Sequence, residues 1–166
     1  MAAEIIKVKY LPELRAVANL ADEIWHECFP GIISEGQIDY MVNKFQSLEA
    51  MIKQIEEQKY SYFAVRENGD LCGYFAVKPE EDSRLFLSKL YLRLDRRGRG
   101  LATDMLRRVF EEARRYGKKS VYLTVNKYND RAIDIYIHSG FKVIDETVTD
   151  IGEGYVMDDF IMEYVL

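Results

Sequence analysis

The chain has 166 residues, of which 48% are hydrophobic, so a single domain spanning residues 1–166 with a substantial core is expected. The net charge of −5 argues against a nucleic-acid-binding scaffold. Cys28 and Cys72 lack the spacing of metal ligands. Without a leader-like segment or a long apolar run, the sequence predicts a cytoplasmic protein with free thiols, no metal and no membrane partner.

The first half of the sequence predicts three helices between strands. Residues 4–10 alternate as in a strand, Pro12 can open a helix that Pro30–Gly31 breaks, and Ser34 and Ser47 are expected to cap the next two helices. The helix from Ser47 is expected to run to residue 58. Strands are then expected at 60–66 and 71–78, joined by an Asn-Gly hairpin turn.

The second half alternates strands with helices. Strands are expected at 85–92, 119–125, 141–148 and 155–165, and helices at 103–116 and 129–139. The complete order is β-α-α-α-β-β-β-α-β-α-β-β, which predicts an α/β fold with a mixed sheet.

A glycine-containing loop, Arg97 to Ala102, lies between the strand at 85–92 and the following helix. The first N–H groups of a helix lack partners within it and carry the positive end of its dipole, so they can bind phosphate oxygens. Gly98 and Gly100 allow a close backbone approach, and Arg97 and Arg99 add positive charge. The loop has neither the Lys-Ser/Thr pair of a P-loop nor the third glycine of a dinucleotide fingerprint.

The loop resembles the Arg/Gln-x-x-Gly-x-Gly/Ala pyrophosphate loop of the GNAT superfamily of N-acetyltransferases, with Arg97, Gly100 and Ala102 at the defining positions. A second segment is similar to that superfamily's N-x-x-A-x-x-x-Y-x-x-x-G-F block. Its matching positions are Asn129, Ala132, Tyr136, Gly140 and Phe141. The two motifs in this order identify the chain as resembling a GNAT acetyltransferase.

The resemblance implies a mostly antiparallel central sheet with splayed strands and flanking helices, and acetyl-CoA as the acyl donor. It implies that backbone groups of Leu90, Tyr91 and Leu92 pair with the pantetheine arm. The remaining residues expected to bind the cofactor are Arg97, Gly98, Arg99, Gly100, Leu101, Ala102, Thr103, Asn129 and Ala132. Asn129 can also cap its helix.

Acetyl transfer to an amine needs a proton for the leaving thiolate, and Tyr136 is the candidate general acid because a phenol has a pKa of about 10. The alternative is that Tyr136 only packs beside the cofactor. The general base stays open among Glu23, His26, Glu27, Tyr91, Asp158 and Asp159.

The acceptor is expected to bind near Trp25, His26, Glu27 and Phe29, which precede the break at Pro30. We expect transfer to a small primary amine, such as a polyamine or an amino compound, because the C-terminal segment resembles bacterial polyamine-type acetyltransferases. The alternatives are acetylation of protein N-termini or lysines, and a non-catalytic regulator that binds acyl-CoA. A homodimer is compatible with the resemblance.

Overall fold

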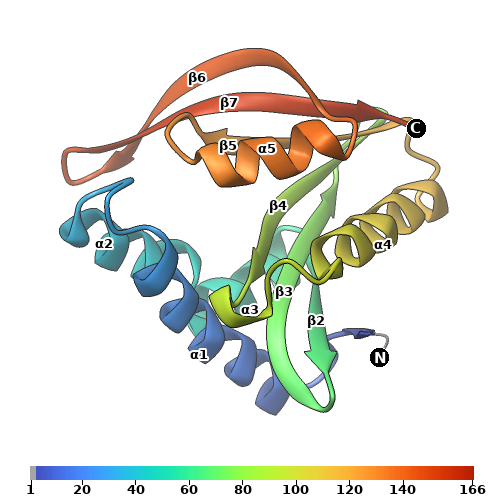
Figure 1. Ribbon diagram of the computed structural model, residues 1–166, viewed down its shortest axis with the longest axis horizontal. Coiled ribbons are helices and arrows are strands. Elements are labelled where there is room, and N and C mark those ends of the chain that lie inside the picture. The colour runs from blue at the N-terminus through green and yellow to red at the C-terminus, as the bar shows by residue number, and fades with distance from the viewer. Residues whose placement is uncertain (1–2) are drawn as a thin grey trace.

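The structure is a computed structural model that describes residues 3–166. These residues form one seven-stranded sheet with helices on both of its faces (Figure 1). The helices are α1 (Leu11–Cys28), α2 (Glu35–Phe45), α3 (Leu48–Glu57), α4 (Leu101–Arg115) and α5 (Asp130–His138), with a 3-10 turn, η1 (Leu94–Arg96). The strands are β1 (Glu4–Lys7), β2 (Ser61–Glu67), β3 (Asp70–Pro79), β4 (Arg84–Leu92), β5 (Ser120–Asn126), β6 (Lys142–Gly152) and β7 (Tyr155–Val165).

The strands lie in the order β1-β2-β3-β4-β5-β7-β6. All neighbours are antiparallel except β4 and β5, which run parallel. The predicted order of elements and the mixed, mostly antiparallel sheet are therefore confirmed. The sequence did not predict η1, which lies between β4 and the glycine loop.

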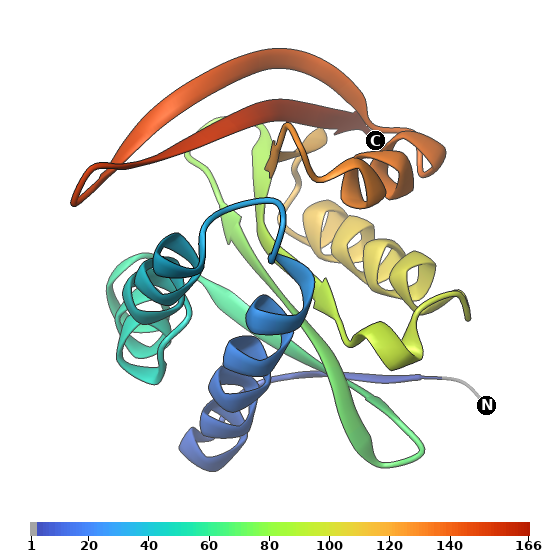
Figure 2. The same ribbon diagram turned by 60° about the vertical axis from the view of Figure 1, so that its left-hand side comes forward.

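Helices cover both faces of the sheet (Figure 2), and a cluster of buried hydrophobic side chains lies on each face. Helix α4 packs Met105, Leu106 and Val109 against one face, where α5 also contributes Tyr136. Helices α1 and α3 cover the other face, and α2 joins α1 in a smaller cluster that reaches Ile151 at the end of β6. Helices α1–α3 and helices α4–α5 therefore lie on opposite sides of the central strands.

The predicted turns and caps explain where several elements begin. Ser34 Oγ accepts from the Gln37 amide at 3.1 Å, and Ser47 Oγ accepts from the Ala50 amide at 3.2 Å. The reciprocal bond of a capping box is absent from α2, because the Gln37 side chain donates to the Val156 carbonyl instead. Asn68 and Gly69 both have positive φ, as the predicted hairpin turn requires.

Three boundaries differ by two residues or more from those predicted. Strand β1 ends at Lys7 rather than residue 10. Helix α4 begins at Leu101 rather than residue 103, because Gly100 adopts a φ of 82° and ends the loop there. Strand β6 extends beyond residue 148 to Gly152, because its pairing with β7 continues to the tight turn at Glu153–Gly154.

Candidate active site

The central feature of the site is the separation of β4 from β5. The two strands pair only at their beginnings, where Arg84 to Phe86 lie opposite Ser120 to Tyr122. Beyond these positions, β4 continues to Leu92 and β5 continues to Asn126 without pairing to each other. A cavity of about 990 Å³ lies between the diverging edges and is lined by residues 87–92 and 123–126.

A β-bulge at Ser88 determines which side chains of β4 point to each side of the sheet. Leu87 pairs with Val77 and Lys89 with Ala76, so Ser88 has no residue opposite it on β3. Leu85 and Leu87 pack in the core beneath α4, and after the bulge Leu90 and Leu92 do so. Lys89 and Tyr91 consequently face helices α1–α3, because an extra residue reverses the alternation of a strand.

The glycine loop opens into the same cavity. Gly98 and Gly100 have φ values of 79° and 82°, and a Cβ atom at either position would have no neighbour within 4 Å. Glycine is therefore favoured at both positions by the positive φ, and not because a larger side chain would collide with a neighbour. No side chain caps the start of α4, so its first N–H groups remain available to an anion such as phosphate.

The arginines of the loop have different roles. Arg97 lines the cavity, and its guanidinium donates to the Leu92 carbonyl at 3.2 Å and contacts Cys28 Sγ at 3.0 Å. Arg99 does not line the cavity, because its guanidinium pairs with Glu67 at 2.7 Å. Arg96 binds the same carboxylate at 3.2 Å. The two ion pairs with Glu67 hold the loop against the end of β2.

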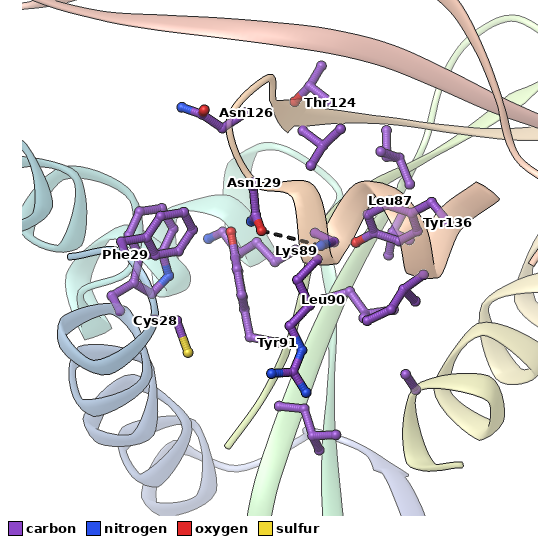
Figure 3. Close-up of a pocket in the computed structure, with 18 of the residues that line it drawn as sticks. Cys28, Phe29, Leu87, Lys89, Leu90, Tyr91, Thr124, Asn126, Asn129 and Tyr136 are labelled. Carbon is purple, nitrogen blue, oxygen red and sulfur yellow. Dashed lines mark hydrogen bonds between the residues drawn. The ribbon is translucent and has the colours of Figure 1, made fainter. Parts of the chain in front are cut away.

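Helix α5 contributes Asn129, Ala132 and Tyr136 to the cavity wall. The Asn129 side chain accepts from the Ala132 amide at 3.3 Å, so the predicted cap is confirmed. Tyr136 is 8% exposed, and burial raises the pKa of its phenol well above the usual value. Figure 3 shows Tyr136 on one side of the cavity and Phe29 and Cys28 on the other, with Tyr91 between them.

An aromatic wall forms the side of the cavity nearest α1. The rings of Trp25 and Phe29 stack with centroids 4.2 Å apart, and the Tyr91 ring lies 5.4 Å from that of Trp25. Glu27 also lines the cavity and is exposed. His26 lies outside it, because its ring bonds Asp39 at 2.6 Å and the Asp22 carbonyl at 2.8 Å. These bonds raise the pKa of His26.

The structure distinguishes the candidate bases by their surroundings. Glu23 pairs with Arg93 at 2.9 Å and Asp158 with Lys127 at 3.0 Å, and neither lines the cavity. Asp159 does line it and is 6% exposed. Burial, aided by the neighbouring Asp158 charge, raises the pKa of Asp159 to about 6.

Most of the residues predicted for the site are brought together around this one cavity. Those that line it are Trp25, Glu27, Phe29, Leu90, Tyr91, Leu92, Arg97, Gly98, Gly100, Leu101, Ala102, Thr103, Asn129, Ala132 and Tyr136. Sequence reasoning missed Lys89, which also lines it and is 5% exposed. The available signal was one charged residue in the interior of a mainly apolar strand.

A sheet that opens between two parallel strands, with an uncapped helix start at the opening, defines an α/β protein that binds an extended ligand carrying phosphate. The chain belongs to the Acetyltransferase (GNAT) family, which its sequence matches over residues 19–141. It is an acetyl-CoA-dependent N-acetyltransferase.

Individual relatives agree with this assignment. The chain is 30% identical over 131 residues to an uncharacterized N-acetyltransferase of Mycobacterium tuberculosis (strain ATCC 25618 / H37Rv), covering 79% of this chain and 82% of the relative. The fold is similar to that of the PaiA N-acetyltransferase of Thermoplasma acidophilum in complex with coenzyme A, with a TM-score of 0.84, 24% identity and full coverage of both chains. YncA of Salmonella typhimurium, with its cofactor acetyl-CoA, has a TM-score of 0.68 and 19% identity, covering 100% of this chain and 95% of its own.

Within residues 3–166, no group of three or more His, Cys, Asp or Glu side chains is arranged to hold a metal ion. No helix in this part of the chain is long and apolar enough to cross a membrane.

Proposed function

We propose that the protein transfers the acetyl group of acetyl-CoA to a small primary amine bound on the α1–α3 side of the cavity. One observation carries this proposal: the same cavity is lined by the glycine loop, by Tyr136 and by Asp159. A phosphate-binding end, a proton donor and a proton acceptor therefore share a single cavity.

In this proposal the cofactor lies along the diverging edges of β4 and β5. The N–H groups of Leu101, Ala102 and Thr103 at the start of α4 hold its pyrophosphate, because they have no partner within the helix. Leu90 and Leu92 present their backbone groups to the opening, where β5 no longer pairs with them, because the alternation of the antiparallel ladder directs the backbone of Tyr91 toward Tyr74 on β3. The groups of Leu90 and Leu92 are available to the pantetheine amides. Asn129 and Ala132 flank this path on α5.

Acetyl-CoA supplies the activated acyl group. Asp159 serves as the general base, since it is buried at the cavity and its raised pKa, about 6, lies close to neutral pH. Tyr136 keeps its proton throughout the neutral range, because its pKa is raised, and it holds that proton for the leaving sulfur. Tyr136, Asp159 and Tyr91 all line the same cavity.

We also propose that the chain is a single catalytic domain of the cytoplasm. One continuous seven-stranded sheet across residues 3–166 supports the first part. Free Cys28 and Cys72 thiols, which are typical of reducing compartments, support the second.

The test is thiol release from acetyl-CoA against amines, amino acids and short peptides, with calorimetric titration of coenzyme A. Turnover with small amines and not with peptides is the expected result. Preferred turnover with peptides would favour a protein acetyltransferase. Tight coenzyme A binding without turnover on any amine would favour a non-catalytic regulator.

A further inference from the structure

Lys89 places a buried amino group on the proposed acceptor side of the cavity. The bulge at Ser88 directs it away from α4 and toward the connection between α2 and α3. Its ammonium donates to the Phe45 carbonyl at 2.6 Å and to Gln54 Oε1 at 2.8 Å, and it also contacts the Tyr62 hydroxyl. Lys89 is 5% exposed and lines the cavity.

The groups around this ammonium are all uncharged. Within residues 3–166, no carboxylate lies within 4.0 Å of Lys89 Nζ. The aromatic rings nearby belong to Tyr60 and Tyr62, 6.0 and 5.1 Å away, and both phenols have raised pKa values and stay neutral. A buried charge is costly without an opposite charge, and burial lowers the pKa of Lys89 to about 7.

The lining of the cavity shows what kind of ligand can supply the missing charge. The part that residues 25–60 contribute includes Glu27 but is mainly apolar and aromatic, with Trp25, Phe29, Ile32, Met41, Phe45 and Tyr60. Gln46, which is 3% exposed, adds a side-chain amide to the same cavity. The carboxylates of Glu27 and Asp159 also line the cavity. Neither lies within 4.0 Å of the Lys89 ammonium, so a ligand group that reaches Lys89 meets a lysine and not a carboxylate.

We propose that the acceptor carries a carboxylate as well as its amine, and that Lys89 binds this carboxylate. The acceptor is then an amino acid-type compound with an apolar connecting chain, rather than a polyamine. This inference rests on the proposed function, because it concerns the acceptor of the same reaction.

The first test compares three acceptors with the same five-carbon chain: 5-aminopentanoate, pentylamine and 1,5-diaminopentane. For the wild type we expect kcat/KM to be about tenfold or more higher for the aminocarboxylate than for pentylamine, since a charge-assisted hydrogen bond typically supports such a factor. Lys89→Met should remove this preference by lowering kcat/KM for the aminocarboxylate alone. Lys89→Gln repeats the comparison with a polar side chain in case methionine prevents folding.

Lys53→Met is the matched control, because Lys53 is an exposed lysine of α3. It should keep the wild-type preference. Preference of the wild type for the diamine, or an unchanged ratio in Lys89→Met, would overturn the inference while leaving acetylation of small amines intact.

A second test measures proton uptake without any reaction. At pH 8 Lys89 is mostly neutral in the free cavity, because its pKa is about 7. Binding of pentanoate should restore its charge, so the coenzyme A-loaded protein should take up protons during calorimetric titration in buffers of different ionisation enthalpy. Lys89→Met should take up none.

These readouts separate the two proposals. Proton uptake that depends on Lys89, in a protein that acetylates no small amine, would support the carboxylate site and reject the proposed function. Acetylation of small amines with no preference for the aminocarboxylate, and with no proton uptake, would support the proposed function and reject the carboxylate site.

Discussion

At the scale of single residues, burial raises two pKa values in the cavity with different consequences. The pKa of Asp159 reaches about 6, so this carboxyl changes its charge just below neutral pH. The pKa of Tyr136 moves further from neutrality, so the phenol stays protonated. One cause, removal from water, therefore brings the pKa of the carboxyl close to neutral pH and keeps the phenol protonated.

Tyr136→Phe should lower kcat by about 100-fold, because it removes the proton for the leaving thiolate without changing the ring. The KM for acetyl-CoA should change by less than about threefold, since the loss concerns the transition state. Steady-state kinetics with thiol detection measure both constants. Unchanged turnover would leave Tyr136 with only a packing role against Phe141.

Asp159→Asn should lower kcat/KM by about 100-fold and remove the acid limb of its pH profile. In the wild type, activity should fall as pH falls through about 6, because protonated Asp159 cannot accept a proton. Asp158→Asn is the control. It should keep the limb but move it to lower pH, since the Asp158 charge raises the pKa of Asp159. An unchanged limb in Asp159→Asn would assign the base elsewhere.

Asp159→Asn should increase the stability of the fold, although it lowers activity. The folded state disfavours the charged carboxylate of Asp159, so its contribution to stability is present at low pH and is lost as pH rises through about 6. Asp159→Asn should therefore raise the free energy of unfolding at pH 8 by about 1 kcal/mol, a value reduced for partial solvation. Chemical denaturation at pH 8 and at about pH 3 measures this difference, which should disappear at the lower pH because the carboxyl is then protonated in both the folded and the unfolded state.

At the scale of elements, the features that depend on a few neighbouring residues could be predicted from the sequence. Ser34, Ser47 and Asn129 each act within one turn of their own helix, and all three caps were predicted. The bulge at Ser88 could not be predicted, because it is a property of the register between β3 and β4. The direction of Lys89 depends on that register, so its place in the cavity also escaped sequence reasoning.

The glycine loop allows a prediction with a closely matched control. Gly100→Glu should abolish coenzyme A binding, because it places a side chain and a negative charge where phosphates are expected. Gly69 has a similar φ, 83°, and equally open surroundings in the β2–β3 hairpin. Gly69→Glu should therefore carry a similar backbone strain and still bind. Calorimetric titration measures coenzyme A binding by each variant. An equal loss of binding in the two variants would attribute the effect to backbone strain.

At the scale of the whole molecule, the sheet consists of two parts joined by three residue pairs between β4 and β5. A ligand bound between the diverging edges contacts both parts. Coenzyme A at 100 times its dissociation constant should stabilise the fold by about 2.7 kcal/mol. For a chain of this length, the melting temperature should rise by roughly 5–10 °C. Thermal melts measure the shift, and Gly100→Glu should show none; an equal shift in that variant would place the coenzyme away from the loop.

The alternation of β4 after Ser88 also affects how this enzyme can diverge during evolution. Side chains of Leu90 and Leu92 lie beneath α4, whereas Lys89 and Tyr91 face α1–α3. With the acceptor bound as proposed, a mutation at Lys89 or Tyr91 should alter the acceptor side and leave Leu90, Leu92 and their backbone in place. We therefore predict that, after gene duplication, a single substitution at either position would change the amine preference of one copy while its affinity for acetyl-CoA is retained.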